Sequence, residues 1–131
     1  MPEVKTYDAP ELLGELLLFE ISPEYCRDAL TIKAAETETP LGAVLMRNAD
    51  GTLSLWTPAA EPEEGKTADP DPAAAGVLLR AVPASASNTA APVLKRGALV
   101  SATALKWPAG TAEDKKGAAL AALEALGIIA R

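Results

Sequence analysis

The stretch LGAVLMRNADGTLSLWT, residues 41–57, decides the fold. Its second half alternates, so Leu53 and Leu55 share one face of an extended chain and Trp56 lies on the other. Between the two apolar halves, Asp50-Gly51 supplies the positive backbone φ that a tight hairpin turn needs. The stretch therefore predicts a β-hairpin, and it makes β-structure the basis of the fold.

Further apolar runs extend the strand pattern on the C-terminal side of the hairpin. Residues 76–82 are typical of a buried strand, and residues 91–95 with 97–105 predict a further pair of strands. The intervening residues 58–74 are rich in proline, glutamate and aspartate, which is typical of an exposed acidic loop. We therefore expect the β-structure between residues 42 and 107.

One helix is predicted over residues 112–126. Thr111 stands in the N-cap position, and acidic residues follow in the first turn, where the helix dipole favours them. Three leucines recur at helical spacing, and Gly127 stands where a left-handed C-cap is expected. We expect this helix to cover the sheet and residues 128–129 to continue as a short terminal strand.

These patterns predict an α+β, mostly β fold: a small β-rich domain, sheet-like or barrel-like, over residues 41–131 with one C-terminal helix. Residues 1–40 are expected to form an extended N-terminal arm, because glycine and prolines interrupt this region. The apolar run at residues 15–21 would mark a partner site if it were exposed. The alternative, in which this run folds back as another core strand, stays open.

The composition argues for a binding protein rather than a catalyst. The chain has no histidine, the commonest proton-transfer residue near neutral pH and a leading metal ligand, so we expect no enzyme, no cofactor and no metal site. Twelve basic and eighteen acidic residues give a net charge of −6, which disfavours nucleic acid as a partner. The most apolar stretch, residues 117–130, is too short to span a bilayer, and residues 1–5 lack the layout of a secretory signal.

Three weak signals for chemistry have simpler interpretations. Gly65-Lys66-Thr67 matches the end of a phosphate-binding loop, but its upstream glycine is missing and no helix pattern follows. Cys26 lacks a histidine that would activate it, so a structural cysteine is favoured. The acidic loop lacks the spacing of a calcium loop. A small enzyme using carboxylates and Cys26, and a free-standing β-barrel adaptor that binds a peptide or small ligand, stay as alternatives.

A set of short segments resembles the head decoration proteins of lambda-like tailed bacteriophages through its order and spacing. The resemblance spans about residues 41–131, and the N-terminal arm is similar in position to the family's N-terminal segment. The segments that carry it are Leu41-Gly42-Ala43-Val44-Leu45, Asp50-Gly51, Trp56, Ala75-Gly76-Val77-Leu78, Arg96-Gly97, Leu105-Lys106-Trp107-Pro108 and Leu126-Gly127-Ile128.

The resemblance implies a capsid cementing protein. Such a subunit is made in the host cytoplasm, forms homotrimers on the outer surface of the expanded head, and pairs its N-terminal segment with the major capsid protein as an added strand. No nucleic acid or membrane is implied as a partner. The residues expected to contact the capsid are Leu16, Leu18, Phe19 and Ile21. Those expected to make either trimer or core contacts are Trp56, Trp107 and Ile128.

Overall fold

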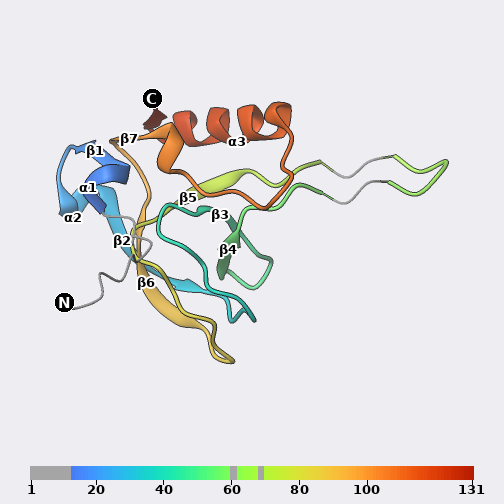
Figure 1. Ribbon diagram of the computed structural model, residues 1–131, viewed down its shortest axis with the longest axis horizontal. Coiled ribbons are helices and arrows are strands. Elements are labelled where there is room, and N and C mark those ends of the chain that lie inside the picture. Colours follow the sequence, from blue (N-terminus) through green and yellow to red (C-terminus); the bar gives the residue numbers. More distant parts are fainter. Residues whose placement is uncertain (1–12, 60–61, 68–69) are drawn as a thin grey trace, which may run out of the picture.

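This computed structural model describes residues 13–59, 62–67 and 70–131 of the chain (Figure 1). Two small β-sheets and one long helix are its main elements. The elements in chain order are α1 (Leu13–Leu16), β1 (Leu17–Glu20), α2 (Pro23–Cys26), β2 (Arg27–Ile32), β3 (Val44–Arg47), β4 (Leu53–Leu55), β5 (Ala74–Leu78), β6 (Thr89–Leu94), β7 (Ala98–Val100), the 3₁₀ helix η1 (Ala102–Ala104), α3 (Glu113–Ala125) and β8 (Ile128–Ala130). The expected mostly β fold with a C-terminal helix is confirmed.

The first sheet is a closed barrel with the strand order β2-β4-β3-β5-β6. The predicted hairpin is confirmed: β3 and β4 pair antiparallel, with Leu45 opposite Leu55, and Gly51 has a φ of 88° in the turn. Each strand contributes a buried apolar side chain to one cluster, which includes Ile32, Leu45, Leu53, Leu78 and Val93. Side chains therefore fill the barrel.

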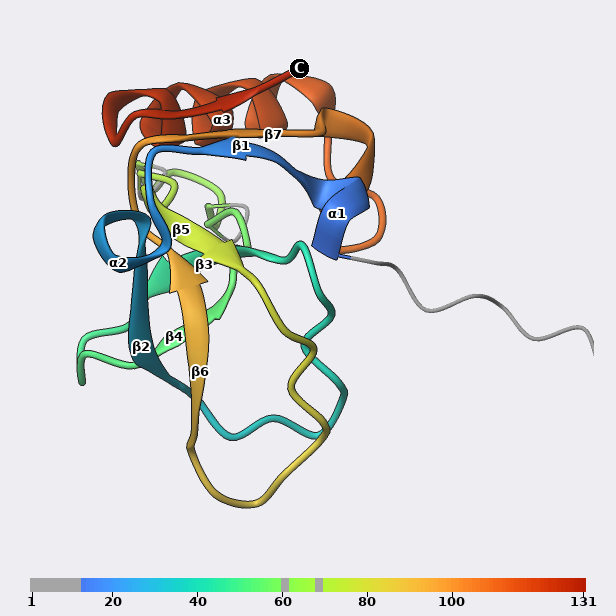
Figure 2. The ribbon, with the colours of Figure 1, turned by 90° about the vertical axis from the view of Figure 1, so that its left-hand side faces the viewer.

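The second sheet has the order β1-β7-β8 and lies with α3 over one side of the barrel (Figure 2). A second apolar cluster fills the space between these layers. It joins Val44, Val77 and Leu94 of the barrel to Val100 and Leu123 of the covering layer. Helix α3 covers the barrel as expected, and it does so together with the β1-β7-β8 sheet.

The connection from β6 to β7 differs from the sequence prediction. The two strands do not pair with each other, because β6 pairs with β2 and β5 whereas β7 pairs with β1 and β8. Gly97, between them, has a φ of +69°, and an added Cβ would lie 3.0 Å from Ile21 Cδ1 and 3.4 Å from Cys26 Sγ. This turn carries the chain out of the barrel, and residues 102–104 then form η1 rather than extending β7.

The predicted extended arm over residues 1–40 needs correction from residue 13 onward. β1 pairs antiparallel with β7, and β2 pairs with β6 along all six of its residues as a wall of the barrel. Leu16, at the end of α1 and directly before β1, is 1% exposed in the core. Pairing with β7 and burial in the core outweigh the turn signals around this region, so residues 13–40 belong to the folded domain. Residues 1–12 of the predicted arm lie outside the described residues.

Helix α3 begins and ends close to its predicted limits, but its N-cap differs. Ala112 occupies the N-cap position without a side-chain cap, and Thr111 instead donates its hydroxyl to the carbonyl oxygen of Pro108 at 2.6 Å. Gly127 follows the C-cap with a φ of +85°, as expected. Of the three leucines at helical spacing, Leu123 alone is fully buried.

The acidic loop ends at residue 73, because β5 begins at Ala74. Its described tip, residues 62–67, lies away from the barrel and α3 (Figure 1). Asp71 fastens its base: one carboxylate oxygen accepts the Ala59 N–H at 2.8 Å and the other pairs with Lys115 Nζ of α3 at 2.7 Å. The Lys115 ammonium and the Ala59 N–H lower the pKa of Asp71 below its usual value.

We expect Leu16→Ala to lower the free energy of unfolding by about 2–5 kcal/mol, because it leaves a cavity in a packed core. Leu18→Ala is the matched control, since its side chain is 51% exposed. Urea unfolding of both variants measures the difference. Equal stabilities would contradict the placement of Leu16 in the core.

We expect Asp71→Asn to flatten the acid side of the stability profile. A carboxylate with a lowered pKa stabilises the fold above its usual pKa, and that contribution is lost as the pH falls through its folded-state pKa. The wild type should therefore be the more stable at neutral pH, and the two should converge in acid. Thermal unfolding from about pH 2 to 7 measures this, with the exposed Glu64→Gln as control. Parallel curves for wild type and Asp71→Asn would contradict it.

Candidate interaction surface

Large apolar side chains are exposed together on β1 and the turn that follows it. Leu18, Phe19, Ile21 and Tyr25 each expose more than half of their surface. A β-bulge between Leu17 and Phe19 interrupts the pairing of β1 with β7, and both Leu18 and Phe19 face solvent there. Exposed apolar groups gathered in this way on a small domain mark a surface that meets a partner.

The exposed apolar surface continues across the whole three-stranded sheet. Phe19 is paired with Leu99, and Leu99 is paired with Ile129, so the three side chains form a row on one face. Phe19 is 61% exposed and Ile129 is 42% exposed, and Leu99 between them is partly exposed. This surface is called the apolar patch below and consists of Leu18, Phe19, Ile21, Tyr25, Leu99 and Ile129.

Ion pairs border the apolar patch. Arg27 donates Nε to Glu20 Oε2 at 2.9 Å, and this partner raises the pKa of the Arg27 guanidinium. Arg96 lies 5.4 Å from the centre of the Tyr25 ring and pairs with Asp28 at 3.2 Å. An apolar centre with a polar rim is the usual anatomy of a protein–protein interface.

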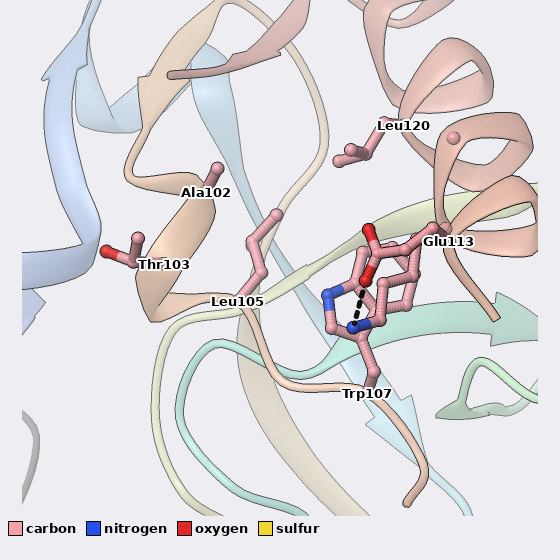
Figure 3. Close-up of a pocket in the computed structure, with 8 residues that line it drawn as sticks. Ala102, Thr103, Leu105, Trp107, Glu113 and Leu120 are labelled. Atoms are coloured by element: carbon pink, nitrogen blue, oxygen red, sulfur yellow. Dashed lines mark hydrogen bonds and ion pairs between the residues drawn. The ribbon is translucent and has the colours of Figure 1, made fainter. Parts of the chain in front are cut away.

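A groove runs along α3 beside the patch. Its first part is a cavity of about 500 Å³ between η1 and α3, where Leu105, Trp107 and Leu120 surround the space with Glu113 at the rim (Figure 3). Its second part is a cavity of about 310 Å³ between α3 and β8. Gly117 and Leu120 line both parts. The two cavities are therefore treated as one feature, the α3 groove.

The structure brings some of the predicted contact residues together and not others. Leu18, Phe19 and Ile21 share the apolar patch, whereas Leu16 is buried in the core and cannot contact a partner as predicted. Sequence reasoning missed Tyr25, Leu99 and Ile129. No local signal separates Leu99 and Ile129 from their neighbours, because residues 98–100 and 128–130 are all apolar, and only their burial patterns in the structure set the two apart.

The residues predicted to make trimer or core contacts lie mostly in the core. Trp56 and Ile128 are at most 1% exposed. Trp107 is partly buried and packs edge-on against Trp56, with ring centres 5.6 Å apart and planes at 88°. Trp56 donates Nε1–H to the carbonyl oxygen of Pro72 at 2.7 Å, so this pair also holds the base of the acidic loop.

The residues behind the weak signals for chemistry occupy ordinary structural positions. Cys26 is fully buried, with Sγ 3.4 Å from the carbonyl oxygen of Gly97. Lys66 is exposed in a turn and pairs with Glu63 at 2.9 Å. Within residues 13–59, 62–67 and 70–131, no group of three or more Cys, Asp or Glu side chains could hold a metal ion. In the same residues, no helix has the length and apolar character needed to cross a membrane.

Comparison with known proteins points to a protein family. The family model described as Bacteriophage lambda head decoration protein D matches residues 6–128, which is nearly the whole chain. No curated protein matches it.

Proposed function

Because the chain belongs to the bacteriophage lambda head decoration protein D family, we propose that it cements the expanded head as a homotrimer whose apolar patch contacts the major capsid protein. The family is structural rather than catalytic, and its members belong to the virion capsid. The observation that carries the proposal is the row formed by Phe19, Leu99 and Ile129 on the outer face of a three-stranded sheet.

The apolar patch is small, so the proposal expects weak binding by one patch and strong binding by three patches together. Burying a large apolar side chain contributes roughly 1.5–3 kcal/mol, whereas association costs about 4–15 kcal/mol in lost freedom of motion. One patch of this size therefore gives modest affinity. In a trimer, the second and third patches bind at a high effective concentration, so the clamp is far tighter than one contact.

Residues 1–12 have a separate role in the proposal. They lie outside the described residues and precede α1, so they are the part of the predicted arm that remains once residues 13–40 are assigned to the folded domain. In the proposal this segment supplies the strand that pairs with the major capsid protein. Strand addition gains backbone hydrogen bonds, and alternate side chains provide specificity.

Charge supports a place on the outside of the head. One chain carries −6, so three copies carry three times −6, which is −18. Such a charge disfavours the DNA-facing side of a shell and suits a solvent-facing one. The subunit would be made in the host cytoplasm and would bind after the head expands.

We expect Phe19→Lys to weaken binding to undecorated expanded heads by roughly tenfold or more, because it removes an apolar contact and places a charge in the interface. Stability should change little, since the side chain is exposed. Co-sedimentation with heads measures the affinity. Ala86→Lys, which adds the same charge in an exposed loop between β5 and β6, should bind as the wild type does. Equal binding by both variants would contradict the role of the patch.

Removing residues 1–12 tests the strand-pairing role. The deletion keeps every described element, so the shortened protein should still fold, which circular dichroism checks. Its affinity for expanded heads should fall by roughly tenfold or more, because strand pairing is lost. A chain with a Gly/Ser segment of equal length in place of residues 1–12 controls for bulk and should bind as weakly as the deletion. Normal decoration by either form would rule out this role.

A further inference from the structure

We propose that the α3 groove is a second contact for the shell: an extended segment of the major capsid protein lies in it and adds, as a fourth strand, to the edge of β8 that no described strand covers. The inference rests on the proposed function and deepens it by naming what the partner inserts. It concerns a capsid segment that enters this subunit. It is therefore distinct from the pairing proposed for residues 1–12.

The length of the groove suits a short strand. Helix α3 has 13 residues, which corresponds to about 20 Å at the rise of an α-helix. An extended segment of about six residues covers that length. The two cavities that make up the groove, about 500 and 310 Å³, provide room along the helix for its side chains.

One wall of the groove is the edge of a strand. The Gly127 carbonyl oxygen accepts the Ala98 N–H at 3.1 Å, and the Arg131 N–H donates to the Val100 carbonyl oxygen at 2.9 Å. Backbone groups alternate in direction along a strand, so the N–H and C=O of Ala130 lie on the side of β8 that faces away from β7. Ala130 also lines the groove. A groove between a helix and a strand edge is the arrangement in which domains such as PDZ add a peptide strand.

The opposite wall of the groove is helix α3, which leaves room for a bound segment to come close. Gly117 lies within α3, where glycine is unfavourable, and an added Cβ there meets no atom within 4 Å. The packing of the subunit therefore does not require this glycine. The missing side chain at Gly117 leaves the groove open where its two parts meet. There, Lys116 and Leu120 line the first part of the groove, and Ala121 lines the second part.

Continuity with the apolar patch favours the shell as the occupant. Ile129 belongs to the patch through its pairing with Leu99, and it also lines the α3 groove. A partner seated on the patch therefore reaches the groove at Ile129. The groove is apolar at Leu105 and Leu120 and has both charge signs at its rim, so it fits a segment with apolar residues at alternate positions.

The test places a larger side chain of this subunit in the α3 groove. Gly117→Leu projects a side chain into the open space and should leave the fold intact, whereas Ala118→Leu makes a comparable change at an exposed helix position that lines neither cavity. Affinity for expanded heads and self-association without heads are measured for both. We expect Gly117→Leu to lose roughly tenfold or more in head affinity with unchanged self-association, and Ala118→Leu to match the wild type.

The other outcomes separate this inference from the proposed function. If Gly117→Leu binds heads as the wild type does, the groove inference is wrong and the proposed function stands. If Gly117→Leu loses self-association without heads, the occupant is a second copy and the inference is also wrong. If the wild type does not bind heads, the proposed function itself fails.

A measurement on the unmodified protein covers the case in which Gly117→Leu does not fold. Amide hydrogen exchange at Ala130 is compared between free protein and protein bound to heads. We expect exchange to slow by roughly tenfold or more on the head, because an added strand engages this N–H. An unchanged exchange rate would overturn the inference.

Discussion

Strand β7 holds the outer layer of the molecule together, because β1 pairs with one of its edges and β8 with the other. The apolar patch and the α3 groove both depend on this pairing. It places Phe19, Leu99 and Ile129 in one row, and it sets β8 beside α3 so that a groove forms between them. The inward side chains of the same strands, among them Val100 and Ile128, fasten the layer to the outside of the barrel. The binding surface is thus the outer side of a sheet whose inner side is core.

The sequence predicted the parts of the fold that depend on local signals. The hairpin around Asp50-Gly51 and the end of α3 at Gly127 follow from backbone preferences that neighbouring residues impose, and both are confirmed. The partners of strands are not local. Nothing near Gly97 shows that β6 and β7 belong to different sheets, and the run around Leu16 fits an arm and a core element equally well. The pairing of β1 with β7 decides between them, and it depends on residues about eighty positions apart.

The same limit explains the candidate site. Leu18, Phe19 and Ile21 could be predicted because they are apolar and adjacent in sequence, but the patch also needs Leu99 and Ile129 from the other end of the chain. Ile128 was predicted to make trimer or core contacts and lies in the core, whereas its neighbour Ile129 is exposed. Which of two neighbouring apolar residues in a strand meets the core depends on tertiary packing. The groove could not be predicted from the sequence at all, since it arises where α3 and η1 meet at a distance that only tertiary packing sets.

The central claim is that the outer face of the β1-β7-β8 sheet lies against the phage shell. Electron cryo-microscopy of expanded heads saturated with the protein tests it most directly, because the orientation of each subunit is then visible. The account predicts three copies around each site, with Phe19, Leu99 and Ile129 turned toward the shell and the barrel turned outward. A reconstruction in which this face is exposed to solvent, and another face of the subunit meets the shell, would contradict it.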